Sequence, residues 1–115
     1  MQSRVVTYQN GELTVKLTVV AASILVSVAR SLLRTDASKA LDANPDAPEA
    51  VRILHRWTYP DLIAATVAAE GIPWPLSFDD FAALPEELGD LWSRAVYELN
   101  PHWLGVEATP AEKKD

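Results

Sequence analysis

No cysteine occurs among the 115 residues of this chain. This absence excludes disulfides, thiolate metal sites and cysteine nucleophiles, and it fits a reducing compartment. Only four glycines are present, and they form no glycine-rich phosphate-binding loop. The most apolar run, Leu17 to Ala29, contains Thr18, Ser23 and Ser27 and is shorter than the ~20 residues that span a bilayer. We therefore expect no membrane anchor, and the strand-like beginning of the chain predicts no signal peptide.

Positive charge is scarce in the second half of the chain. Residues 1–57 hold seven Lys or Arg against five Asp or Glu, a net charge of +2. Residues 58–115 hold three against eleven, a net charge of −8, which brings the total to −6. Nucleic-acid binding requires clustered Lys and Arg, so we expect none. The acidic half could steer a basic partner, but we favour a solvated face that aids solubility.

Residues that could carry catalysis are few and do not form a recognisable pattern. Neither His55 nor His102 has a second histidine at the spacing of helical metal ligands, so we predict no metal site. The carboxylate pairs 79–80 and 86–87 lie at predicted helix starts, where acidic residues are expected for capping reasons alone. No serine lies in a Gly-x-Ser-x-Gly turn. We therefore predict no catalytic residue, no cofactor and no enzyme activity.

The beginning of the chain has the pattern of a β-hairpin. Arg4–Gln9 and Glu12–Leu17 are rich in β-branched residues, and Asn10–Gly11 between them favours a type I′ turn. Leu13, Val15 and Leu17 alternate with polar residues, which indicates one face on the core and one in water. An isolated hairpin is only marginally stable, so this one must pack on helices or pair with a strand of another chain.

A helix is predicted from about Val20 to Leu33, and it has two apolar stripes. One stripe contains Val20, Ile24, Leu25, Val28 and Leu32, and the other contains Val19, Ala22, Val26, Ala29 and Leu33. A helix that is apolar nearly all round should be buried nearly all round. Two interpretations stay open: either the helix runs through the middle of the domain, or one of its faces binds a second chain.

Further helices are predicted after a polar loop at residues 35–47. One begins near Pro48 and carries Trp57, and the next has Thr58 as its N-cap, runs from Asp61 to Glu70 and ends at Gly71. A short helix follows Ser77, and the last ends before Asn100–Pro101. The predicted fold is thus α+β, with an N-terminal β-hairpin followed by a bundle of four to five α-helices. We expect residues 1–104 to form one domain and residues 105–115 to form a disordered C-terminal tail.

Tryptophan and tyrosine fill the cores of small helical domains but are also enriched at binding sites. We expect Phe81 and Trp92 in the core. Trp74 lies between two prolines and Trp103 lies just after a helix end. For each of these, a position in the core and a position at an interface both remain possible. The candidate partner-binding residues are Val19, Val26, Leu33, Trp74 and Trp103.

Two segments carry a resemblance to a known family. The segments WTYPDLIAA at 57–65 and PEELGDLWSRAVYELNP at 85–101 resemble small tail assembly chaperones of long-tailed phages and prophages. In that family a strand pair leads into a helical body. The resemblance implies a non-catalytic protein of the bacterial host cytoplasm. It would coat the hydrophobic tape-measure protein until tail tube subunits replace it, and some members self-associate.

Two other functions are compatible with the same residues. One is a homo-oligomeric structural or connector subunit of a phage tail, which would form a fixed assembly. The other is a small acidic regulatory protein that binds one folded partner, and its binding would depend steeply on salt.

Overall fold

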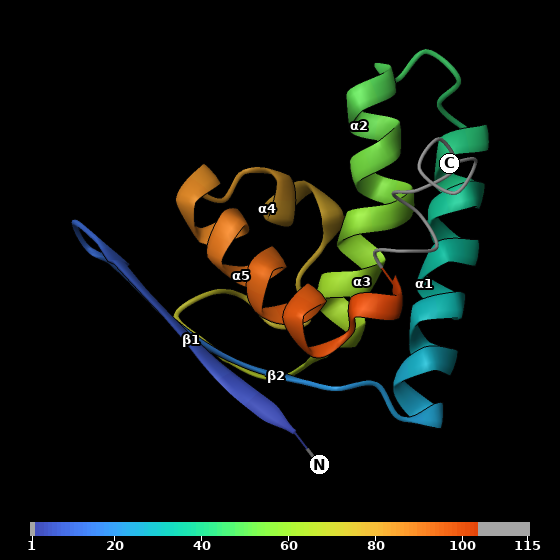
Figure 1. Cartoon of the computed structure of the whole chain (residues 1–115). Coiled ribbons are helices and arrows are strands. Elements are labelled where there is room, and N and C mark those ends of the chain that lie inside the picture. Colours follow the sequence, from blue (N-terminus) through green and yellow to red (C-terminus); the bar gives the residue numbers. More distant parts are fainter. Residues whose placement is uncertain (1, 104–115) are drawn as a thin grey trace, which may run out of the picture.

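A computed structural model describes residues 2–103 and has an α+β fold. Figure 1 shows the helices on one side of a three-stranded antiparallel sheet of order β1-β2-β3. The elements are β1 (Ser3–Asn10), β2 (Leu13–Val20), α1 (Ile24–Asp42), α2 (Glu49–Ile53), the π-helical segment η1 (Leu54–Thr58), α3 (Tyr59–Ala64), β3 (Thr66–Glu70), α4 (Phe78–Ala82) and α5 (Glu86–Leu99). The N-terminal hairpin and helical body are therefore confirmed. The predicted tail at 105–115 lies outside the described residues.

The hairpin has the predicted turn and the predicted faces. β1 and β2 pair from Ser3–Val20 to Asn10–Leu13, and Gly11 has φ of +62°. Val15 and Leu17 are fully buried, and Val6 and Tyr8 of β1 are buried beside them. The sheet thus supplies one wall of the core, and α3 and α5 supply the other.

The helix predicted up to Gly71 is shorter than expected, because its second half forms a strand. α3 ends at Ala64, and Thr66–Glu70 pairs with the free edge of β2. Thr66 is buried, where its hydroxyl accepts from Trp92 Nε1 at 2.9 Å and donates to the Leu62 carbonyl at 2.7 Å. Gly71 has φ of +91°, and a Cβ atom there would lie 1.9 Å from the Thr14 carbonyl oxygen. Gly71 therefore allows the chain to turn close against β2 instead of capping a helix.

The helix predicted at 20–33 begins later and extends further. Val19 and Val20 stay in β2 because they pair with Arg4 and Ser3, and Ser23 caps α1 by accepting from Val26 N at 3.2 Å. α1 continues to Asp42, so most of the predicted loop at 35–47 is helical. Local sequence favours a loop there, but burial of Ala37 and Leu41 favours continuation of the helix.

Asn100 joins three elements at the corner between β2 and α1. Its fully buried side chain accepts from Ala22 N at 2.7 Å and donates to the carbonyls of Val20 and Val96, each at 3.1 Å. The Asn-Pro pair was predicted only to end a helix. The side-chain amide of Asn100 also bonds the N–H of Ala22 and the carbonyl of Val20, and it thereby satisfies two backbone groups where β2 changes to α1.

Thr58 does not begin a new helix, contrary to the prediction. α2, η1 and α3 form one continuous helical segment, and the Thr58 side chain makes no capping hydrogen bond. Pro60 lacks an N–H group, and the π-helical turn before it accommodates this gap in the helical hydrogen bonds. The Asp61 side chain is consequently free to point into the protein.

An aromatic cluster fills the space between η1, α3 and α4. The His55 ring stacks on Phe78 with centroids 3.9 Å apart, and Tyr59 meets both rings edge-on. The Tyr59 hydroxyl donates to the Leu76 carbonyl at 2.6 Å. Burial lowers the pKa of His55, and the nearby Asp79 carboxylate opposes this shift only in part. The neutral imidazole is therefore the form that the folded protein favours.

We expect the free energy of unfolding to fall as the pH drops below the ordinary histidine pKa of 6.5. A lowered pKa in the folded state means that the unfolded chain binds the proton more tightly, so the stabilisation is complete above this pH and lost below it. Urea denaturation between pH 7.5 and pH 5 measures the effect. H55F should make the free energy of unfolding less dependent on pH while retaining the ring stack on Phe78. H102F is the matched control and should keep the pH dependence of the wild type. Identical profiles for wild type and H55F would contradict this role of His55.

Candidate interaction surface

The rotation of α1 about its axis is fixed by one buried carboxylate. Asp61 is fully buried and accepts from Arg30 Nε and from Arg34 Nη2 at 3.4 Å, both from α1. It also accepts from the Tyr97 hydroxyl of α5 at 2.7 Å. Arg30 and Arg34 are one helical turn apart, so the side of α1 that carries them must face α3 and α5.

The protonation states of this cluster support the arrangement. Burial, and then the negative charge of Asp61, raise the pKa of Tyr97 far above its usual range, so its phenol is a neutral donor. Burial and the neighbouring Arg30 lower the pKa of Arg34, while Asp61 opposes this shift, and guanidinium groups remain charged in proteins. The two guanidinium groups also lie over tryptophan rings, Arg30 at 4.3 Å from Trp103 and Arg34 at 4.6 Å from Trp57.

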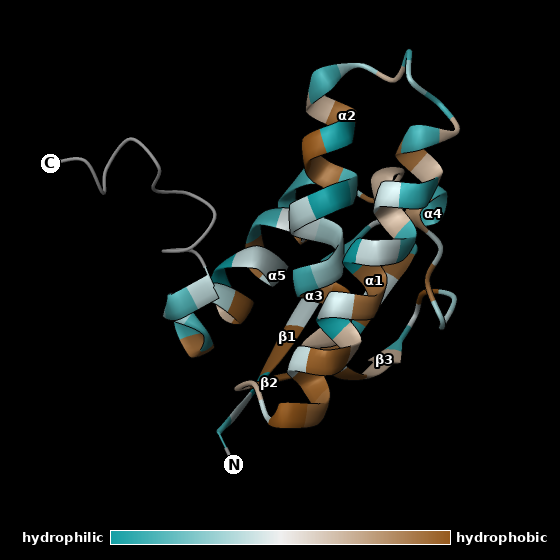
Figure 2. Cartoon of the chain, turned by 90° about the vertical axis from the view of Figure 1, so that its right-hand side faces the viewer, coloured by the Kyte–Doolittle hydropathy of each residue, from teal (hydrophilic) through white to brown (hydrophobic). Residues whose placement is uncertain are grey.

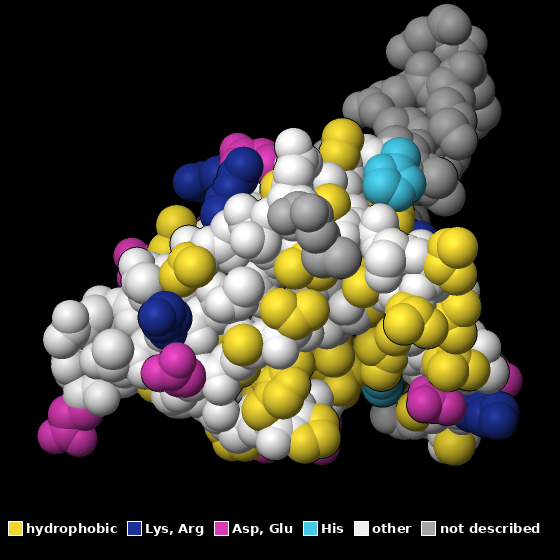
Figure 3. Space-filling view, turned by 90° about the horizontal axis from the view of Figure 1, so that it is seen from below, with side chains coloured by type: hydrophobic (Ala, Val, Ile, Leu, Met, Phe, Trp, Pro, Cys, Tyr) yellow, Lys and Arg dark blue, Asp and Glu magenta, His cyan; other side chains and the backbone are white. Residues whose placement is uncertain are grey.

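The opposite side of α1 is apolar and exposed to solvent. Its residues, hereafter the α1 apolar face, are Ile24 (83% exposed), Leu25 (80%), Val28 (51%) and Leu32 (61%). Figure 2 shows hydrophobic colouring at the beginning of α1. Figure 3, viewed from beneath the sheet, shows hydrophobic side chains from the middle of that surface to the side where α1 lies. Exposed apolar residues grouped in this way are typical of binding surfaces.

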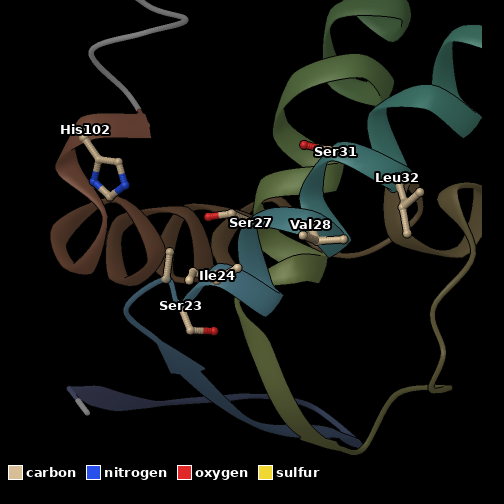
Figure 4. Close-up of a pocket in the computed structure, with 8 residues that line it drawn as sticks. Ser23, Ile24, Ser27, Val28, Ser31, Leu32 and His102 are labelled. Atoms are coloured by element: carbon tan, nitrogen blue, oxygen red, sulfur yellow. The ribbon is translucent and has the colours of Figure 1, made fainter.

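A shallow groove of about 690 Å³ runs beside this face. Ser23, Ser27 and Ser31 form a row of small side chains along α1, and His102 lies across the groove from them (Figure 4). The small side chains leave room for the backbone of another helix to approach. The groove therefore combines an apolar ridge with a neighbouring channel of small residues.

The groove is lined by serine, histidine and apolar side chains. Among the described residues that line it there is no Asp or Glu. Within residues 2–103, no group of three or more His, Asp or Glu side chains could hold a metal ion. In the same part of the chain, no helix combines the length and the apolar character that crossing a membrane requires.

The structure separates the five candidate partner-binding residues. Val19 lies in β2 with no exposed surface, and Trp103 is 2% exposed beneath Arg30. Val26 and Leu33 are partly buried and pack against the core. Trp74, in the irregular segment between β3 and α4, is 37% exposed. The outward face of α1 is therefore the stripe with Ile24 and Val28, not the stripe with Val26 and Leu33.

Two arginines mark the side of α1 that faces the protein interior. Arg30 and Arg34 lie one helical turn apart within α1. They share a helix side with Val26, Leu33 and Ala37. This side must face inward if a buried acid elsewhere in the chain pairs with the two arginines. Asp61 is that acid, because its carboxylate accepts from both arginines.

We compared the chain with protein-family models, with curated proteins and with solved structures, and no match was found in any of the three.

Replacing Asp61 with asparagine should lower the free energy of unfolding by about 3 to 5 kcal/mol, because two guanidinium groups would lose their buried counter-charge. Urea denaturation at pH 7 provides the measurement. D79N is the control: Asp79 is exposed at the start of α4, and its loss should cost less than about 1 kcal/mol. Equal losses for the two variants would show that Asp61 does not organise the helices.

Proposed function

We propose that this chain is a non-catalytic chaperone that holds an apolar helical segment of another protein against the α1 apolar face. The observation that carries the proposal is the row of exposed Ile24, Leu25, Val28 and Leu32 on adjoining turns of α1. An amphipathic helix of the partner would place its own apolar side chains against this ridge, as in other helix-in-groove complexes.

The electrostatics of α1 support an apolar partner. Arg30 and Arg34 are turned inward to Asp61, so no charged side chain interrupts the four exposed apolar residues. The whole chain carries a net charge of −6, and this charge keeps a complex soluble while the apolar face is in use. Binding through the α1 apolar face should depend only weakly on salt.

The resemblance of residues 57–65 and 85–101 to tail assembly chaperones supports a specific partner class. We propose that the partner is the tape-measure protein of a long-tailed phage or prophage, held in the bacterial cytoplasm until tail tube subunits replace the chaperone. A tape-measure protein is long, helical and hydrophobic, and an apolar helix face is complementary to such a chain. Release requires only moderate affinity, which four apolar side chains on one helix can supply.

A homo-oligomeric structural subunit of a phage tail is the second candidate, and the same face favours it for a different reason. The α1 apolar face and the serine row lie side by side on one helix, so two copies could pair through this surface around a twofold axis. Such an oligomer would be fixed and would not exchange its partner.

Val28 and Val51 provide a matched test, because both are exposed valines on helices, at 51% and 40%. We expect V28E to weaken binding of a tape-measure helical segment at least about tenfold, because a carboxylate would be buried in the complex. V51E should bind as wild type does. Co-expression measures whether the segment stays soluble, and titration calorimetry measures the affinity. Equal binding by both variants would exclude the α1 apolar face as the holding surface.

Light scattering across a concentration series distinguishes the two candidates. A chaperone should be monomeric or form weak oligomers that the tape-measure segment dissociates. A structural subunit should form an oligomer of constant mass that V28E disrupts and the segment leaves intact.

A further inference from the structure

A second surface lies away from α1, at the free edge of the sheet. β1 is an edge strand, and the hydrogen bond from Ala21 N to the Gln2 carbonyl (3.0 Å) establishes which of its backbone groups pair with β2. Because the pattern of an antiparallel ladder alternates, the even-numbered residues of β1 direct their N–H and C=O groups toward β2. Ser3, Val5, Thr7 and Gln9 direct theirs outward. Among residues 2–103, no turn or loop backbone bond reaches these four residues.

Helix α5 forms the second wall of a groove along this edge. The β1–α5 groove has a volume of about 290 Å³ and is lined by residues that include Arg4, Val5 and Thr7 of β1 and Leu91, Arg94 and Glu98 of α5. Arg4 pairs with Glu98 near the C-terminal end of α5, and the Tyr8 hydroxyl donates to Glu87 near its beginning at 3.3 Å. β1 and α5 therefore run in opposite directions side by side. A groove between an edge strand and a helix is the arrangement that accepts an added strand.

The charge of this groove is opposite to that of the whole chain. Its lining carries two arginines and one glutamate, a net charge of +1, whereas the chain carries −6. Arg4 is paired with Glu98, but Arg94 is exposed and forms no ion pair within the part of the chain that the structure describes. Leu91, one turn before Arg94 on α5, is 37% exposed. The groove thus presents an apolar contact next to a cation.

We propose that the β1–α5 groove binds an extended segment of a partner protein by strand addition to β1, and that this segment carries an apolar and an acidic side chain two positions apart. Its backbone would pair with the outward groups of Val5 and Thr7. One apolar side chain would contact Leu91, and a carboxylate on the same side of the added strand would pair with Arg94. The proposal does not depend on the α1 apolar face.

The chemistry of β1 disfavours a second copy of this chain as the occupant. β1 contains Arg4 and no acidic residue. A second β1 added to the groove would therefore bring a further cation toward Arg94 and no carboxylate to pair with it. An acidic partner strand satisfies both the backbone and the charge.

The probe is a capped synthetic peptide as long as β1, 8 residues, in which valine and glutamate alternate along one face and threonine occupies every position of the other face. We expect it to slow amide hydrogen exchange at Val5 and Thr7 in the full chain, measured by NMR. T7P removes an outward N–H and leaves the β1–β2 ladder intact, so it should weaken binding about tenfold. T7A retains this N–H and should bind within about twofold of wild type. R94Q should weaken binding and reduce its salt dependence, and R94K should restore both in part.

A peptide that is N-methylated on the amides facing β1 tests the same hydrogen bonds without altering the protein, so the test stands even if T7P fails to fold. Loss of binding by this peptide, with retention by a peptide methylated on the opposite amides, would support strand addition. Three results would overturn the proposal. These are absence of binding, chemical-shift changes confined to α1, and protection of Val5 and Thr7 that rises with protein concentration in the absence of peptide. The last result would identify a second copy as the occupant.

Discussion

The arrangement of the helices depends on the Asp61 carboxylate, which is buried and shared by Arg30, Arg34 and Tyr97. Moving charged groups out of water is costly, so the cluster is stable only when its members are held together. It joins α1, α3 and α5, and it allows one rotation of α1. In that rotation Val26 and Leu33 pack inward, and the other apolar stripe of the helix remains in contact with water.

Asn100 has a comparable role for backbone groups. The chain changes from strand to helix between Val20 and Ser23, where neither ladder nor helical hydrogen bonds are complete. The buried amide of Asn100 supplies the missing donor and acceptor from the end of α5. Together, Asp61 and Asn100 attach α1 to the rest of the domain by polar contacts. Most of the apolar surface of its first turns is consequently not needed for packing.

The two exposed surfaces differ in the partner chemistry that they can recognise. The α1 apolar face offers side-chain contact without charge, which suits an apolar helix. The β1–α5 groove offers backbone donors and acceptors with a net positive lining, which suits an extended acidic strand. They lie on separate elements, so occupation of one does not require the other to be vacant. A protein that holds an aggregation-prone partner gains from two such contacts, because weak sites that act together bind more tightly than either alone.

Local chemistry in the sequence determined the hairpin, because Asn10–Gly11 and the alternation in β2 act between neighbouring residues. It also determined the end of α5 before Pro101 and the presence of two apolar stripes in α1. The tertiary structure alone decided that Thr66–Glu70 is a strand, because the free edge of β2 becomes available only when the sheet forms. It likewise decided which stripe of α1 is exposed. Both stripes are apolar in sequence, and the contact with Asp61, about thirty positions further along the chain, decides which of them faces the core.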